Sequence, residues 1–184
     1  SQLVSTLTDA ESKIFLGKNS LIDVAGLQNV SVAMERNFIE SLLTYLDLKD
    51  DPINRNGFLY RQKVWFDIRN VPESKVADVA GFVKQVPRSL GEKLATAGTV
   101  KLKSEGDFIQ STGSKIDVSG GSLKFESGVH KETQLIAANG KTYAIGDAPE
   151  DTLFTGFVGG TNTLMRQESG YTEGKAAGTV KIDA

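Results

Sequence analysis

The sequence contains no cysteine, which excludes both a disulfide framework and thiolate catalysis. It has a single histidine, His130, so a typical His-rich metal site is excluded as well. No apolar run reaches the roughly 20 residues that a membrane-spanning helix needs. The N-terminal stretch SQLVSTLTDAES lacks the basic region and apolar core of a signal peptide. We therefore expect no metal, no cofactor and no insertion into a membrane.

Neither sign of charge is in excess. The chain of 184 residues has 21 basic and 23 acidic side chains, for a net charge of −2. Nucleic acids are bound through a positive field and anionic membranes through clustered basic residues. This sequence provides neither, so we expect no nucleic-acid partner and no attraction to an anionic membrane.

Two short phrases each occur twice in this chain. SLIDVAG at 20–26 matches SKIDVSG at 114–120, which places Asp23 and Asp117 in the same position, 94 residues apart (117 − 23). AGTVKLK at 97–103 likewise matches AGTVKID at 177–183. Repeated strand phrases that end in glycine turns are typical of repeat architectures. We expect several coils and some insertions to separate the two copies.

Most of the sequence has the alternation of β-strands, broken by short glycine, serine and asparagine turns. The clearest strand candidates are residues 63–68 (KVWFDI), 99–103, 108–110, 115–118 and 122–125. ANGK at 138–141 predicts a hairpin, because Asn-Gly favours a type I′ turn. These signals predict an all-β protein.

Three segments depart from this pattern. Residues 73–94 have helical periodicity and predict a short helical insertion, with a helix over 76–85 and a second turn capped by Ser89 and Glu92. Residues 49–57 (KDDPINRNG) are expected to form a polar loop. Residues 126–170 are expected to be an irregular excursion from the repeat.

The fold predicted from these features is a right-handed parallel β-helix, a solenoid with a helical insertion and hairpin excursions. A β-sandwich also has short strands and regular turns, but the β-helix is favoured because the phrases recur in sequence. We expect residues 1–184 to be a single segment of a longer protein. Apolar positions of the repeated phrases are expected in one core, with Asp23 and Asp117 outward: Ile22, Val24, Ile116, Val118, Val180 and Ile182.

An ordered series of phrases across the chain resembles one family. GSKIDVSGGSLKFESG is followed by TQLIAANGKTYAIGDA, and both are preceded by LIDVAGLQNVSVAMERN, DDPINRNGFLYRQKVWFDIR and SLGEKLATAGTVKLKSEGDFI. With the ending YTEGKAAGTVKI, the series resembles the filamentous haemagglutinin family of large exoproteins, from about Ser20 to Ile182. The resemblance implies a long right-handed parallel β-helix, secretion by the two-partner route through an outer-membrane partner, and a role in adhesion or as the shaft of a contact-dependent toxin-delivery protein. The family's Arg-Gly-Asp tripeptide is absent.

Several residues are of types that could act in catalysis or bind a metal, but we expect none of them to do so. His130 lies in the polar stretch GVHKET and is expected to be an exposed loop residue. Asp47, Asp50 and Asp51 have no calcium-loop spacing, so a solvated turn is expected there. Carboxylates for glycosidic chemistry would come from three aspartates: Asp67, Asp107 and Asp117. Because Asp117 belongs to the repeat, a role in a turn or ladder is expected instead.

Aromatic residues near the middle of the chain offer a candidate sugar-stacking platform, made of Phe58, Tyr60, Trp65 and Phe66. Alternation within KVWFDI predicts that about half of these side chains lie in the core. We expect a non-catalytic segment of a secreted, surface-associated adhesin-like exoprotein. It would serve as a rigid shaft and as a binding surface for a host-cell receptor or glycan. A β-helix enzyme that cleaves polysaccharides is the main alternative.

Overall fold

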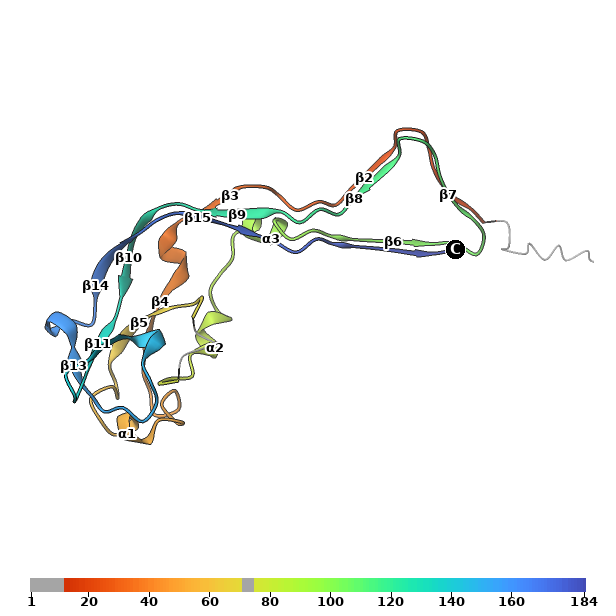
Figure 1. Ribbon diagram of the computed structural model, residues 1–184. Coiled ribbons are helices and arrows are strands. Elements are labelled where there is room, and N and C mark those ends of the chain that lie inside the picture. Colours follow the sequence, from red (N-terminus) through yellow and green to blue (C-terminus); the bar gives the residue numbers. More distant parts are fainter. Residues whose placement is uncertain (1–11, 71–74) are drawn as a thin grey trace, which may run out of the picture. The chain divides into compact units, whose positions relative to one another are not determined.

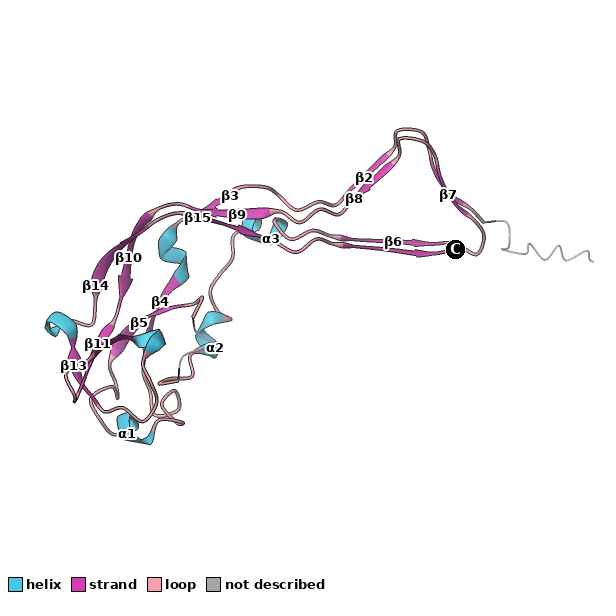
Figure 2. Cartoon of the chain, viewed as in Figure 1, coloured by secondary structure: helices cyan, strands magenta, loops and turns pink. Residues whose placement is uncertain are grey.

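The computed structural model describes residues 12–70 and 75–184. Figure 2 shows that strands and their connecting loops dominate, and that the helices are few and short. The prediction of an all-β protein is therefore confirmed. The sheets have only two or three strands each, and no closed or solenoid sheet forms among the described strands. Within these ranges, none of the helices has the length and hydropathy needed to cross a membrane.

The chain divides into two compact units, where the sequence predicted one continuous segment over residues 1–184. Unit 1 comprises Ser1–Ser31, Arg88–Lys124 and Thr172–Ala184, of which the first eleven residues lie outside the described part. Unit 2 comprises Val32–Pro87 and Phe125–Tyr171. The predicted excursion at 126–170 thus lies in unit 2, where it forms several regular strands.

The repeated phrases are direct neighbours in unit 1 (Figure 1). Strand β2 (Leu21–Asp23) pairs in parallel with β8 (Lys115–Asp117), and Asp23 is the register partner of Asp117. The expectation that several coils separate the two copies is therefore wrong. Two more parallel pairs follow the same rule: β1 (Ile14–Leu16) with β7 (Phe108–Gln110), and β6 (Thr99–Lys103) with β16 (Thr179–Asp183).

Backbone hydrogen bonds extend this register beyond the strands themselves. Ser111 N donates to Leu16 O, and Val24 N donates to Asp117 O, each at 2.9 Å. Ser122 N donates to Leu27 O at the same distance. Residues from β1 to beyond β2 therefore run beside those from β7 to beyond β8 at a constant offset.

The glycines that end the repeated phrases permit close backbone approach. A Cβ on Gly26 would lie 2.0 Å from Ala95 O, and one on Gly120 would lie 2.0 Å from Lys175 O. Neither glycine has a positive φ. These glycines are therefore explained by close packing, since any side chain would collide with a neighbouring backbone, and not by a left-handed turn.

The aspartates of the repeat serve local turns. Asp23 Oδ1 accepts from Ala25 N at 2.9 Å, and Asp117 Oδ1 accepts from Ser119 N at 3.0 Å. Asp117 also pairs with Lys115, whose hydrogen bond lowers the pKa of this carboxyl. This geometry is the Asx turn, in which a side chain replaces a backbone acceptor.

The predicted burial of the repeat is only partly correct. Ile22, Val24 and their counterparts Ile116 and Val118 are half-buried, and Asp23 is exposed. Val180 and Ile182 in β16 are exposed, so their predicted place in the core is wrong. The reason is that β16 pairs only with β6 among the described strands.

One helix and three strands also lie wholly or partly in unit 1. Helix α3 (Leu90–Leu94) begins with the predicted capping box, in which Ser89 Oγ accepts from Glu92 N and the Glu92 carboxylate accepts from Ser89 N. Strands β3 (Val30–Val32), β9 (Ser122–Phe125) and β15 (Tyr171–Gly174) form a three-stranded sheet in the order β15-β9-β3. The division between the units falls within these strands.

Unit 2 is built from antiparallel strands. Strand β4 (Phe38–Leu42) pairs with β5 (Lys63–Asp67), and β10 (Gly128–Glu132) pairs with β14 (Leu164–Glu168). Strand β11 (Gln134–Ala137) lies between β12 (Thr142–Ala144) and β13 (Phe154–Phe157). Short helices connect them: η2 (Met34–Asn37), α1 (Pro52–Arg55), α2 (Ala80–Val83), η4 (Ile145–Asp147) and η5 (Val158–Gly160).

The core of unit 2 follows strand alternation. In β5, Val64 and Phe66 are fully buried, and Trp65 between them is half-buried, as the KVWFDI pattern predicts. They join an apolar cluster of buried side chains: Leu43, Leu48, Leu59, Val64, Phe66, Val76, Ala77, Val79, Leu135, Ala137, Ile145, Ala148 and Phe154.

The helical insertion is smaller than predicted. Helix α2 covers only Ala80–Val83 of the expected 76–85, and residues 73 and 74 lie outside the described part. Val76 and Val79 are buried as the apolar stripe requires, but they precede the helix. Burial rather than helical periodicity therefore explains the spacing of these valines.

Two local predictions also need correction. The 49–57 segment contains helix α1, and its Asp51 is buried rather than solvated. The 138–141 hairpin forms between β11 and β12, but only Gly140 has a positive φ, so the turn is not type I′. Gly140 N donates to Ala137 O, and Ala137 N donates to Lys141 O. This pattern is a three-residue loop that ends in a left-handed glycine.

Candidate functional site

A cavity of about 220 Å³ in unit 2 is lined by carboxylates, a histidine and aromatic side chains, which are residue types that commonly bind ligands. Strand alternation places them there. In the β4–β5 pair, Phe38 lies opposite Asp67, and Trp65 is two positions along on the same face of β5. In the β10–β14 pair, His130 and Glu132 share a face with Glu168. The cavity lining is Phe38, Trp65, Asp67, Asn70, His130, Glu132, Thr133, Ala144, Ile145, Gly146, Asp147 and Glu168.

His130 is a buried strand residue, so the prediction of an exposed loop histidine is wrong. It is 5% exposed and its ring stacks on Phe38, with centroids 3.8 Å apart and planes 4° apart. Its Nε2 lies 3.8 Å from Glu132 Oε2, and its Nδ1 lies 3.7 Å from Glu168 Oε2. Both distances exceed hydrogen-bond length. The imidazole is thus held by stacking between two carboxylates that it does not reach.

Arg69 fixes two of the cavity's carboxylates. Its Nη2 lies 2.6 Å from Asp67 Oδ2, and its Nη1 lies 2.7 Å from Glu168 Oε1. The hydrogen bond from Arg69 lowers the pKa of Glu168, and the two carboxylates raise the pKa of Arg69. Arg69 therefore holds both carboxylates in place and favours the ionised form of Glu168.

A third carboxylate is held by a second arginine. Arg166 Nε donates to Glu132 Oε1 at 2.5 Å, and Gln134 Nε2 donates to the same oxygen at 2.8 Å. The other oxygen, Oε2, faces His130. The fourth carboxylate, Asp147 on η4, is exposed. Within the described part of the chain, no lysine or arginine lines the cavity itself.

Two buried nitrogens at the cavity lack partners. Neither His130 Nδ1 nor Trp65 Nε1 has a hydrogen-bond partner among the described residues. A buried polar atom without a partner costs about 1–3 kcal/mol, and native structures rarely leave one. Of the two, His130 Nδ1 marks the cavity as a place where a bound donor group would complete the hydrogen bonding.

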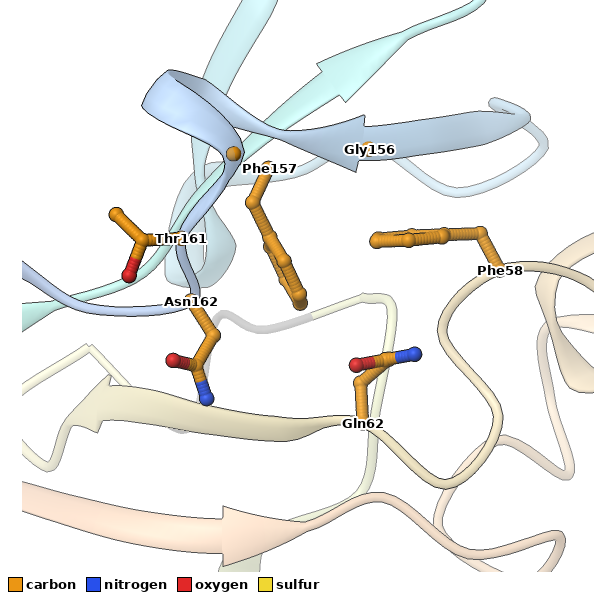
Figure 3. A pocket seen from close by; sticks show the side chains of 7 residues that line it. Phe58, Gln62, Gly156, Phe157, Thr161 and Asn162 are labelled. Carbon is orange, nitrogen blue, oxygen red and sulfur yellow. The ribbon is translucent and has the colours of Figure 1, made fainter.

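A second, more open hollow of about 520 Å³ lies elsewhere on unit 2. Figure 3 shows the rings of Phe58 and Phe157 beside it, with the side-chain amides of Gln62 and Asn162 below them. The two rings meet edge to face, with centroids 4.8 Å apart. The hollow holds no charged side chain among its described lining, so it offers aromatic faces and amides only.

The aromatic residues proposed from the sequence do not form one platform. Trp65 lines the His130 cavity, whereas Phe58 lines the hollow of Figure 3. Phe66 is buried in the core, and Tyr60 is exposed beside Arg61.

The three candidate acids are also separated. Asp67 lines the His130 cavity in unit 2. Asp117 belongs to the Asx turn of unit 1, and Asp107 forms an exposed ion pair with Lys13 at 3.6 Å. Only Asp67 therefore stands near other acids in a cavity.

The aspartates weighed for calcium have structural partners. Asp47 Oδ2 accepts from Thr44 N at 2.7 Å, and Asp51 Oδ2 accepts from Asn54 Nδ2 at 2.8 Å. Asp50 is exposed next to Lys49. No group of three or more ionisable ligands that could hold a metal ion occurs among the described residues.

Sequence reasoning missed His130, Glu132 and Glu168 as a group. A signal was present in GVHKE, where His130 takes the inward position of an alternating strand. Glu168 lies 38 positions further on (168 − 130), and only the antiparallel pairing of β10 with β14 brings it close.

Comparisons with protein-family models, with curated proteins and with solved structures gave no match for this chain.

Proposed function

We propose that this chain is a non-catalytic segment of a secreted, surface-associated exoprotein of the filamentous haemagglutinin type. Unit 1 is part of a right-handed β-helical shaft, and unit 2 is a recognition unit carried in two insertions between strands of unit 1. Its partners are the outer-membrane secretion partner of the full-length protein and a host-cell receptor or glycan.

The observation that carries the proposal is the constant register of unit 1. The pairs β1–β7 and β2–β8 share one offset across an intervening turn. Two successive parallel pairs with one offset are expected when two coils of a solenoid stack on each other. The close approaches at Gly26 and Gly120 suit the crowded backbone of such a stack.

Engineered disulfides test the shaft. Neighbouring strands lie about 4.7–4.9 Å apart, which is within the Cα separation of disulfides. We expect Ile22→Cys with Ile116→Cys to form a bond in the otherwise cysteine-free chain under mild oxidation, as measured by free-thiol counting and mass spectrometry. The matched control is Ile22→Cys with Val118→Cys, which is two positions out of register. Equal bond formation in both variants would refute stacked coils.

Recognition is assigned to unit 2 because segments inserted between the strands of a scaffold, and their loops, commonly carry binding sites. The hollow of Figure 3 supports this role, since Phe58 and Phe157 offer aromatic faces and Gln62 and Asn162 offer amides. Aromatic faces with a few polar groups are the usual composition of small-ligand sites. A glycan fits this chemistry.

Two measurements test the surface role. Antibodies against unit 2 should label intact cells that produce the full-length protein, and the purified chain should bind glycans on an array. Phe157→Ala should weaken the array signal, while Phe15→Ala, an exposed phenylalanine of unit 1, should leave it unchanged. Labelling only after cell lysis would overturn the surface assignment.

One observation favours the polysaccharide-cleaving enzyme as a second candidate. Four carboxylates line the His130 cavity. A glycosidase, however, needs one carboxyl whose pKa is raised so that it can act as a general acid. Arg69 lowers the pKa of Glu168 instead. Release of reducing ends from a glycan, abolished by Glu168→Gln, would establish the enzyme and remove the non-catalytic proposal.

A further inference from the structure

The His130 cavity has the composition of a site for a small cation. Its described lining includes four carboxylates and no lysine or arginine. The two arginines that pair with these carboxylates lie outside the lining, as does Lys131, whose Nζ is 4.7 Å from the Trp65 ring centroid. The described lining therefore offers carboxylate oxygens and no ammonium or guanidinium group. An anionic ligand is disfavoured there by Coulomb repulsion.

The buried histidine gives a second, independent sign of a ligand. His130 is 5% exposed, lines the cavity and leaves Nδ1 without a hydrogen-bond partner among the described residues. Glu132 Oε2 and Glu168 Oε2 lie just beyond hydrogen-bond reach of its two nitrogens. The ring stacks on Phe38, so moving it to close these gaps would weaken the stacking contact. A small donor group beside Nδ1 would satisfy this nitrogen when the ring carries its proton on Nε2.

We propose that the His130 cavity binds a primary ammonium group, either of a small free amine or of an amino sugar. An ammonium has three donors and no acceptor, which suits several separate carboxylates. A bare metal ion requires convergent ligands, and no such group exists among the described residues. The aromatic walls, Phe38 and Trp65, fit the carbon skeleton of the amine. At about 220 Å³, the cavity is below the roughly 300–1,000 Å³ of sites for drug-sized ligands, so the ligand is small.

The single tryptophan gives a direct reporter, because Trp65 lines the cavity and is the only tryptophan of the chain. Titration of the full chain with propylammonium and with glucosamine should change its indole fluorescence and its one indole N–H resonance in a saturable way. Glucose, N-acetylglucosamine and propanol lack the ammonium and should bind at least about tenfold more weakly, since a hydrogen bond to a charged group is lost. Comparing glucosamine with propylammonium shows whether the site takes amino sugars or simple amines.

Two variants locate the binding. Asp147→Asn removes a cavity carboxylate that is exposed, and it should weaken propylammonium binding about threefold or more. Asp50→Asn removes the same charge from an exposed position of unit 2 outside the cavity and should have no effect.

Equal binding of N-acetylglucosamine and glucosamine would overturn the proposal in favour of a neutral sugar site. Displacement of propylammonium by millimolar calcium at constant ionic strength would overturn it in favour of a metal site. Both measurements use the unmodified chain, so they decide the question even if a variant does not fold. Surface labelling of cells is a separate measurement, so failure of the shaft proposal and failure of the ammonium site remain distinguishable.

Discussion

At the scale of single residues, unit 2 contains a buried polar pair next to its core. Asp51 caps α1 by accepting from Asn54 N at 3.2 Å, and Asn54 is fully buried. The Asn54 amide also donates to Thr152 O at 2.7 Å and accepts from Phe154 N at 3.1 Å. One side chain therefore joins α1 to the start of β13.

We expect Asn54→Ala to destabilise unit 2 by about 2–4 kcal/mol. It removes three hydrogen bonds and leaves the Asp51 carboxylate and Phe154 N with fewer partners in a buried place. Chemical denaturation followed by Trp65 fluorescence measures the change. Asn56→Ala, an exposed asparagine of the same segment, is the control and should change stability by less than about 0.5 kcal/mol.

Arg69 is the other residue on which local order depends. It bridges Asp67 and Glu168, and its guanidinium carbon lies 5.5 Å from the ring centroids of both Phe38 and Tyr171. Because Glu168 has a lowered pKa in the folded chain, its charge stabilises the fold at pH values above 4.5, the ordinary pKa of this group. This contribution is lost as the pH falls below that value.

Glu168→Gln should therefore reduce stability at pH 7 by about 1 kcal/mol and flatten the acid limb of the stability curve below about pH 5. Denaturant titrations at pH 7, 5 and 4 give both quantities. Glu40→Gln serves as the comparison, because among the described residues Glu40 forms an ion pair only with the exposed Lys63, at 3.4 Å. A steeper acid limb in Glu168→Gln than in the unchanged chain would contradict the assignment.

Residue patterns predicted some of the site and missed the rest for physical reasons. Alternation in KVWFDI predicts that about half of the four aromatic candidates lie in the core, and of these four only Phe66 is fully buried. The same alternation in GVHKE was overlooked because the polar neighbours of His130 suggest solvent. His130 is buried because Phe38, which is distant in sequence, stacks on its ring.

At the scale of elements, glycine controls how closely the segments of unit 1 pack. The Cβ of any residue at 26 would lie 2.0 Å from Ala95 O and 2.5 Å from Gly121 N. These are backbone atoms, which cannot turn aside as a flexible side chain can. The glycine is therefore a packing requirement of the stack, and the same holds for Gly120 next to Lys175 O.

Gly26→Ala should destabilise unit 1 by about 3 kcal/mol, because the backbone must shift to admit the methyl group. Gly174→Ala is the matched control, since nothing lies within 4 Å of a Cβ at that position. Limited proteolysis of the two variants gives the comparison. Equal resistance would show that the backbone at Ala95 yields without cost.

Elements made from local signals were predicted better than elements made from long-range contacts. The capping box at Ser89 and Glu92 needs four residues only, and it forms as expected. Helix α1 was missed because its cap, Asp51, is stabilised by the distant Thr152 through Asn54. The 138–141 hairpin was found, but its turn type is decided by the register of β11 and β12.

At the scale of the whole molecule, the two units differ in how well their backbones are covered. Strand β11 has neighbours on both sides and contains the fully buried Leu135. Strand β16 has one neighbour among the described strands, and all five of its residues are exposed. Amide protection should follow this difference.

We expect amides of β11 to exchange with solvent more slowly than those of β16 by a factor on the order of 100. Hydrogen exchange followed by mass spectrometry of fragments from residues 134–137 and 179–183 measures the ratio. Similar rates in both fragments would mean that the units open together.

The organisation into two units was beyond the reach of the sequence pattern. Each unit is assembled from separated segments, and the repeat signal marks only unit 1. The offsets of the repeated phrases include the residues of unit 2, so they were interpreted as several coils. Only the pairing of Asp23 with Asp117 shows that no further coil lies between them.

This pairing has a consequence for the time course of synthesis. Strand β2 must wait for β8, 94 residues later, and at about 5–20 residues per second this wait is roughly 5 to 19 s. During that interval the backbone groups of β2 have no partner, which makes this edge open to pairing with another chain. The β4–β5 pair joins Phe38 to Asp67 and closes far sooner. A growing chain therefore folds part of unit 2 first, and a pause in translation between residues 23 and 115 prolongs the exposure of the unpaired strand.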